Sequence, residues 1–291
     1  MTRERFLGFA AAAVGAAAYG LNPLFSLPLY AQGFTPANVL FYRFALAAAI
    51  VGVIIRCRGG KLRAEPGELP ALCVTGALML GSSLTLYQAY RYMDTGIAST
   101  LLFIYPVVVA TVMTLFFHEK LHWRTVAGIV LALAGVAALS KSGGGAVFSW
   151  KGLLLSLASA FSYSLFIVSV RVSVLRDSPA DKIAFYAMLL SAAVCLFLSL
   201  AHNRLPLPRT AAAAGCILML ALLPTVAALV LTALAIHRIG ATPASIFGAL
   251  EPVVAVLCGI VVFHEKFTWN IAVGILLIFC SMLAAVLKPS Q

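Results

Sequence analysis

Charged residues are scarce in this sequence of 291 residues, and acidic residues are the scarcest. Asp and Glu together number nine, charged residues make up 10% of the chain, and hydrophobic residues make up 63%. So little polar surface cannot cover an ordinary water-soluble globule. The composition, with a mean hydropathy of +1.05, therefore excludes that class of protein.

Common signatures of catalysis and nucleotide binding are also absent. The sequence contains no GxxxxGKS or GxxxxGKT and no GxSxG, which disfavours ATP-driven transport by this chain alone and the hydrolases that use the GxSxG motif. The six cysteines lie far apart, without CxxC, and fit small apolar fillers better than a metal site or disulfides. We expect no enzyme, cofactor or metal. An integral-membrane enzyme or an accessory of a lipid flippase would need clustered His, Asp or Cys at one interface.

The chain consists instead of apolar runs of about 20 residues, each long enough to cross a hydrocarbon core of roughly 30 Å. The first run follows Arg3 and Arg5 like a signal peptide, but it continues through Leu29, so we interpret it as a retained span. The pattern predicts an all-α integral membrane protein with ten transmembrane helices, at residues 5–29, 36–56, 69–90, 95–117, 123–140, 151–172, 182–201, 211–236, 241–263 and 269–287.

The net charge of +11 lies mainly in the short loops between these spans. If the N-terminus is cytoplasmic, thirteen Lys and Arg residues lie in loops on that side and six on the other, while Arg43 falls inside the second span. This distribution follows the positive-inside rule, so it places both termini in the cytoplasm and argues against nucleic-acid binding.

The tetrapeptide FHEK occurs twice, at residues 117–120 and 263–266, and aligning the copies reveals a repeat. At this spacing of 146 residues, 106–108 and 252–254 both read PVV. At a spacing of 144 residues, Tyr19 meets Tyr163 and 41–42 meets 185–186, both of which read FY. The chain is thus predicted to contain two five-helix units, 1–140 and 151–291.

Five helices per unit have a geometric consequence. Because five is odd, the second unit crosses the bilayer in the opposite sense to the first, which makes the units inverted repeats, an arrangement widespread among secondary transporters. The FHEK turns then mark the ends of matching helices at opposite membrane faces, and Trp123 and Trp269 become interfacial anchors.

The predicted chain has ten helices in two inverted units, a proline inside the fourth and ninth helices, and the stretches IYPVVVATVMTLFFHEKLHW and LEPVVAVLCGIVVFHEKFTW. In these features it resembles the EamA-type members of the drug/metabolite transporter superfamily. Within it, the general likeness is greatest to the bacterial aromatic amino-acid exporters of the YddG type. The resemblance implies a monomer in the bacterial inner membrane that exports small metabolites, above all aromatic or neutral amino acids. The alternatives are a channel-like pore and an exporter of drugs or other metabolites. The sequence leaves open whether transport is proton-coupled or facilitated.

Polar residues inside apolar spans are the candidates for substrate binding, because such groups usually face a bundle interior or a wet cavity. Glu251 lies near the middle of the ninth span, directly before Pro252, and aligns with Tyr105. It suits a substrate ammonium group or a proton, and a structural acid is the alternative. Arg43 has no polar repeat mate and is expected to snorkel to the nearer interface rather than pair with a carboxylate.

Further candidates share helical faces or flank prolines. Asn22 lies three residues after Tyr19, Ser83 lies four before Tyr87, and Thr225 follows Pro224. Asn22 would also fit a hydrogen bond between helices. The predicted substrate-binding set is Tyr19, Asn22, Ser83, Tyr87, Tyr105, Tyr163, Thr225 and Glu251.

Overall fold

The computed structural model describes residues 3–60, 62–92, 98, 101–118, 123–140, 149–201, 205–263 and 268–286. The N-terminal half contains α1 (Arg3–Gly20), α2 (Asn22–Ala31), α3 (Pro36–Cys57), α4 (Leu69–Ala89), α6 (Tyr105–Phe117) and α7 (Trp123–Ser140). The C-terminal half contains α8 (Trp150–Val172), the 3-10 helix η1 (Val174–Asp177), α9 (Ala180–Ala201), α10 (Ala211–Ala221), the π-helical turn η2 (Leu222–Ala227), α11 (Ala228–Ile239), α12 (Ala241–Phe247), α13 (Leu250–Phe263) and α14 (Trp269–Val286).

Among the described residues, six helical stretches are long and apolar enough to cross a bilayer: Arg3–Ala31, Pro36–Cys57, Leu69–Ala89, Trp150–Val172, Ala180–Ala201 and Ala211–Ile239. α6, α7, α14 and the pair α12–α13 form the described parts of the remaining four spans. The prediction of an all-α protein with ten membrane helices is therefore confirmed. Half of the first FHEK copy (residues 119–120) and three residues of the second (264–266) lie outside the described residues, so the role predicted for these turns is not tested.

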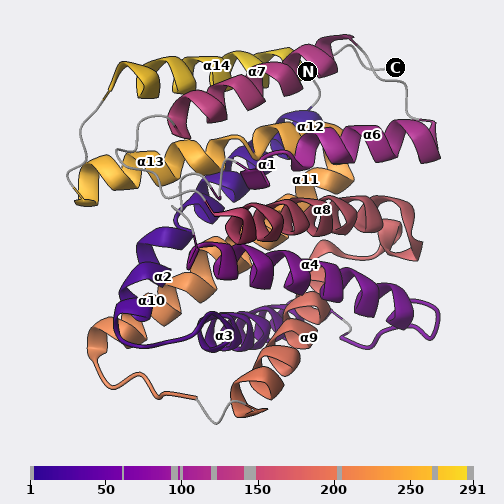
Figure 1. Cartoon of the computed structure of the whole chain (residues 1–291). Helices are drawn as coiled ribbons and strands as arrows, with labels where there is room; N and C mark the ends of the chain where they lie inside the picture. Colours follow the sequence, from indigo (N-terminus) through magenta and orange to yellow (C-terminus); the bar gives the residue numbers. More distant parts are fainter. Residues whose placement is uncertain are drawn as a thin grey trace.

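The pairing of helices follows the inverted repeat. The second and seventh spans (α3 and α9) pack together, as do the fifth and tenth (α7 and α14). These pairs form opposite edges of the bundle, and α1, α4, α8 and α11 lie between them (Figure 1). The first span packs against the eighth (α1 with α11) and the sixth against the third (α8 with α4). Exchanging the two halves turns one of these pairs into the other, as a two-fold relation requires.

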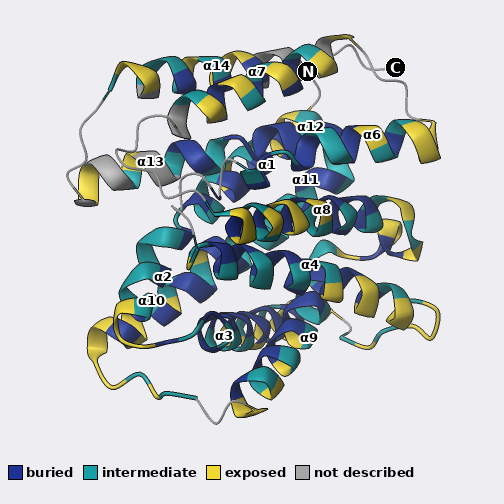
Figure 2. Ribbon diagram, in the orientation of Figure 1, coloured by how far each residue is buried: buried dark blue, intermediate teal, exposed yellow. Residues whose placement is uncertain are grey.

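The outer surface is apolar, as contact with lipid demands. Buried residues line the helix faces that point into the bundle, while exposed residues gather on outward faces and at loops (Figure 2). Large exposed side chains include Phe197 and Leu154. Trp123 and Trp269 are 72% and 80% exposed at the starts of α7 and α14, where interfacial anchors are predicted.

Several spans are interrupted near prolines in the described part of the chain. The first span breaks at Leu21, between α1 and α2, and the eighth widens into the π-helical turn η2 around Pro224. The ninth breaks at 248–249, just before the first turn of α13, which contains Glu251 and Pro252. Proline supplies no backbone N–H and crowds the preceding turn, so carbonyl groups there are released from the helix ladder. These breaks position the site described next.

Candidate transport site

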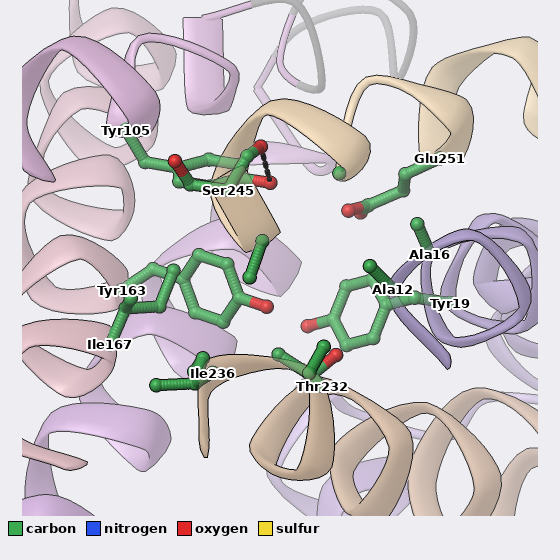
Figure 3. A pocket seen from close by; sticks show the side chains of 13 residues that line it. Ala12, Ala16, Tyr19, Tyr105, Tyr163, Ile167, Thr232, Ile236, Ser245 and Glu251 are labelled. Carbon is green, nitrogen blue, oxygen red and sulfur yellow. Dashed lines mark hydrogen bonds between the residues drawn. The ribbon is translucent and has the colours of Figure 1, made fainter. Parts of the chain in front are cut away.

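Tyr19, in the last turn of α1, borders three internal cavities that share it. The first cavity includes Tyr105, Tyr163 and Glu251, whose side chains surround a common space (Figure 3). We call the three cavities together the Tyr19 chamber. Its polar lining comes from seven spans and consists of Tyr19, Asn22, Arg43, Ser83, Tyr90, Tyr105, Tyr163, Thr225, Thr232, Ser245 and Glu251.

Tyrosine rings form the walls of the chamber. The rings of Tyr19 and Tyr163, which are repeat mates, stack with centroids 6.4 Å apart and planes inclined by 27°. Tyr105 meets Tyr163 edge to face, at 4.9 Å and 85°. Both geometries are favourable for aromatic pairs. Because repeat mates from the two halves touch here, the chamber lies at the interface between the halves.

Tyr105 occupies the first turn of α6, and its repeat mate Glu251 occupies the first turn of α13. The Tyr105 hydroxyl donates to the carbonyl oxygen of Ser245 at a distance of 3.0 Å. This approach requires Gly248, because a Cβ atom at that position would overlap the tyrosine hydroxyl. Corresponding helix starts in the two halves therefore present a phenol and a carboxyl group to one cavity.

Glu251 faces the chamber without a partner. Its carboxyl group points into the first cavity (Figure 3), and no hydrogen bond or ion pair joins it to any other residue in the described part of the chain. The backbone here is tightly packed, because a Cβ atom at Gly20 would collide with the carbonyl oxygen of Glu251. A close contact of α1 with α13 thus fixes the position of an acid whose oxygens are available to a ligand.

Arg43 is inside the bundle, and the expectation that it snorkels to the interface is wrong. The residue is only 2% exposed. Its Nε donates to Thr225 Oγ1 at 2.5 Å, its Nη1 to the Tyr87 hydroxyl at 2.8 Å, and its Nη2 to the carbonyl oxygen of Pro224 at 2.8 Å. The π-helical turn at Pro224 frees that carbonyl group and directs it to α3. The rotation of α3 relative to this turn decides where the Arg43 side chain points. The sequence does not reveal that rotation.

Asn22 extends the same network. It is buried, and its Oδ1 accepts a hydrogen bond of 2.9 Å from the Tyr87 hydroxyl. Its Nδ2 has no partner and lies beside the cavity that also contains Glu251. The Oδ1 atom of Asn22 therefore joins two helices, as the interhelical interpretation expects. Its Nδ2 group is an unpaired donor at the chamber.

The structure brings all eight predicted substrate-binding residues to this region. Seven line the chamber, while Tyr87 lies behind it and links Arg43 to Asn22. Sequence reasoning missed the contribution of the second span, Arg43 and Phe44. The available signal was the charge of Arg43 within an apolar span.

The chamber is closed in this conformation. The space open to the centre of a water molecule is about 20 Å³ in each of two cavities and about 10 Å³ in the third, roughly enough for one water molecule each. A larger hollow lies between α3 and α9, but its lining is almost entirely apolar and it opens outward, so it suits lipid rather than a polar solute. An amino acid would require the chamber to widen.

A model of the EamA-like transporter family matches residues 6–141 and, a second time, residues 150–287. The chain belongs to the EamA-like transporter family. It thus carries two EamA domains of the drug/metabolite transporter superfamily, and this family is one of membrane transporters rather than of enzymes, as the sequence predicts. A lipid bilayer and a small-molecule substrate are the partners that this family implies.

Similar proteins extend this assignment without naming a substrate. An uncharacterized transporter of Synechocystis sp., sll1319, is 30% identical over 198 residues, which are 66% of this chain and 59% of that protein. The uncharacterized transporter YdfC of Bacillus subtilis is 26% identical over 141 residues, 47% of this chain and 45% of that protein. The matches thus span about half the length of these relatives. One solved crystal structure with 18% identity has a TM-score of 0.80 over 95% of this chain and 96% of its own, which shows the shared fold.

Proposed function

We propose that this EamA-family transporter exports amino acids, aromatic or neutral, from the cytoplasm by alternating access at the Tyr19 chamber. The observation that carries the proposal is the unpaired carboxyl group of Glu251 in a chamber walled by tyrosine rings. A carboxylate recognises an ammonium group, and aromatic walls accept an apolar side chain. In a membrane interior, an ionisable group marks the path of a substrate or proton.

The position of the chamber supports alternating access rather than a continuous pore. It lies where Tyr19 and Tyr163 meet across the two halves, and its cavities hold little more than water. Rocking of unit 1–140 against unit 151–291 would widen it toward one side at a time. The proposal includes a bacterial inner membrane as the location, and the charge distribution supports an orientation in which both termini are cytoplasmic.

Transport by the purified protein in proteoliposomes tests the proposal. We expect saturable uptake and counterflow of labelled L-phenylalanine or a neutral amino acid, and a loss of roughly tenfold or more in Glu251→Gln, because one charge-assisted contact is removed. Glu65→Gln makes the same chemical change at an exposed loop residue and serves as the control.

The same assay separates the alternatives. Flux of nucleosides or cationic drugs, with none of any amino acid, would overturn the substrate assignment, and unsaturable flux without counterflow would establish a channel-like pore. Initial rates and accumulation that do not change with an imposed pH gradient would exclude proton coupling and leave facilitated export.

A further inference from the structure

We propose that Arg43 and Glu251 are the two poles of a site for zwitterions, with the carboxylate of the transported amino acid bound at Arg43 and its ammonium group at Glu251. This inference rests on the proposed function and specifies which chemical form of the substrate is recognised. It also assigns a binding role to a residue of the second span, Arg43.

Arg43 is a buried cation whose hydrogen-bond acceptors are all neutral. A hydroxyl of Thr225, a hydroxyl of Tyr87 and the backbone carbonyl of Pro224 accept three of its five N–H groups. In the described part of the chain, no carboxylate forms an ion pair with it. Neutral oxygens compensate the desolvation of a guanidinium only in part. A ligand carboxylate, which matches the planar donors of arginine, would supply the missing negative charge.

The opposite pole is close but separate. Arg43 borders the cavity formed with Tyr19, Tyr163 and Thr232, and Glu251 borders another cavity formed with the same three residues. The guanidinium carbon lies 5.5 Å from the centre of the Tyr19 ring. If the two charges served only to neutralise each other, a direct ion pair would be expected, yet none joins them. Opposite charges held apart around a shared aromatic wall match a ligand that carries both charges and an apolar side chain.

Three ligands that differ only in their charged groups test this inference. L-phenylalanine carries both charges, phenethylamine only the ammonium group, and 3-phenylpropanoate only the carboxylate. Apparent dissociation constants for each would be measured from ligand-induced thermal shifts of the purified protein, which report binding even where a variant no longer transports. For the unmodified protein, L-phenylalanine should bind roughly 10- to 100-fold more tightly than either analogue, because each charged contact contributes that factor.

The variants should remove one preference each. Arg43→Gln should make L-phenylalanine bind no better than phenethylamine, and Glu251→Gln should make it bind no better than 3-phenylpropanoate. Arg43→Lys keeps the charge and should retain part of the preference for a carboxylate. Arg58→Gln removes a positive charge at an exposed position and should change none of the ratios. The elution profile on size exclusion identifies variants that fail to fold. If Arg43→Gln fails to fold, Arg43→Lys and Glu251→Gln still test the inference.

The outcomes distinguish this inference from the proposed function. If the protein transports amino acids but Arg43→Gln weakens L-phenylalanine and phenethylamine by the same factor, Arg43 is structural and the two-pole site is wrong. Equal binding of L-phenylalanine and phenethylamine by the unmodified protein would also overturn it, since the carboxylate would then contribute nothing. If no amino acid is transported or bound, the proposed function itself fails.

Discussion

The loop between α3 and α4 and the loop between α9 and α10 are held by the same contact in opposite halves of the molecule. Tyr186 donates its hydroxyl hydrogen bond to the carbonyl oxygen of Leu62 at 2.7 Å, and Tyr42 donates to that of Pro206 at 2.9 Å. Each residue of one pair lies 144 residues from its mate in the other. The inverted repeat thus builds one tyrosine clamp at each membrane face.

In the part of the chain that the structure describes, charge reinforces only one clamp. Beside the Tyr186 clamp, Glu68 accepts hydrogen bonds from Lys182 Nζ and Ser178 Oγ, and the side chains of Glu68 and Lys182 are only 13% and 10% exposed. Beside the Tyr42 clamp, the corresponding positions hold Ala212, Asn38 and Phe34. Duplication therefore preserved the clamp and differentiated its surroundings. The more firmly tied face is the cytoplasmic one in our proposed orientation.

Removing the charge of Glu68 should have the largest effect on stability, because this charge distinguishes the surroundings of the two clamps. Glu68→Gln leaves Lys182 largely buried without a counter-charge, and we expect a loss of about 2–4 kcal/mol in the free energy of unfolding, near the lower end of the range for buried pairs because some solvent reaches this one. Denaturant titration in detergent micelles measures it. In the double variant Glu68→Gln/Lys182→Met much of the loss should be recovered. A double variant as unstable as the single one would show that the ion pair is not the cause.

Low pH should selectively weaken the contacts of Glu68 beside the Tyr186 clamp. The hydrogen bonds from Lys182 and then Ser178 lower the pKa of the Glu68 carboxyl group from 4.5 to about 2. Since the folded state holds the proton less firmly than the unfolded state, this contribution is complete above pH 4.5 and is lost as the pH falls toward 2. Melting temperatures measured from pH 6 to pH 3 should converge between the unmodified protein and Glu68→Gln. Parallel curves would contradict the assignment.

The two tyrosine clamps should differ modestly in the stability that each gives to its loop. Tyr186→Phe and Tyr42→Phe each remove one hydrogen bond to a carbonyl group, worth about 1 kcal/mol. Tyr186 also accepts a hydrogen bond from the backbone nitrogen of Ala64, so its removal should cost more. Hydrogen exchange of peptides that cover residues 62–68 and 205–213 measures each loop, and each variant is the control for the other. Faster exchange in both loops from either variant would mean that the clamps are not local.

The sequence predicts the fold because lipid imposes simple rules, namely apolar runs of fixed length and polar groups turned inward. The spacing of the repeat pairs Tyr19 with Tyr163 and Tyr105 with Glu251, and the structure brings these four residues to one chamber. The expectation for Arg43 is wrong because a residue a third of the way into a span can reach either the interface or the interior. The packing of α3 on the π-helical turn decides between them, and helix rotation leaves no such signal in the sequence. Whether the chamber residues bind substrate stays a prediction.

The smallest expected effect concerns Asn38, the repeat mate of Lys182. Asn38 is 1% exposed, and both its Nδ2 and its Oδ1 are buried without a partner. Asn38→Leu replaces these groups with an apolar side chain of similar size and keeps the backbone N–H bond to Thr35 Oγ1. We expect stabilisation of roughly 0.5–1 kcal/mol, small because the unfolded chain in a membrane environment also finds polar partners. If unfolding titration instead shows a loss, the amide has a ligand or water that matters at this face. The loop beside the Tyr42 clamp would then be held by a polar contact of its own. The contrast with Glu68 and Lys182 would be one of charge rather than of contribution to stability.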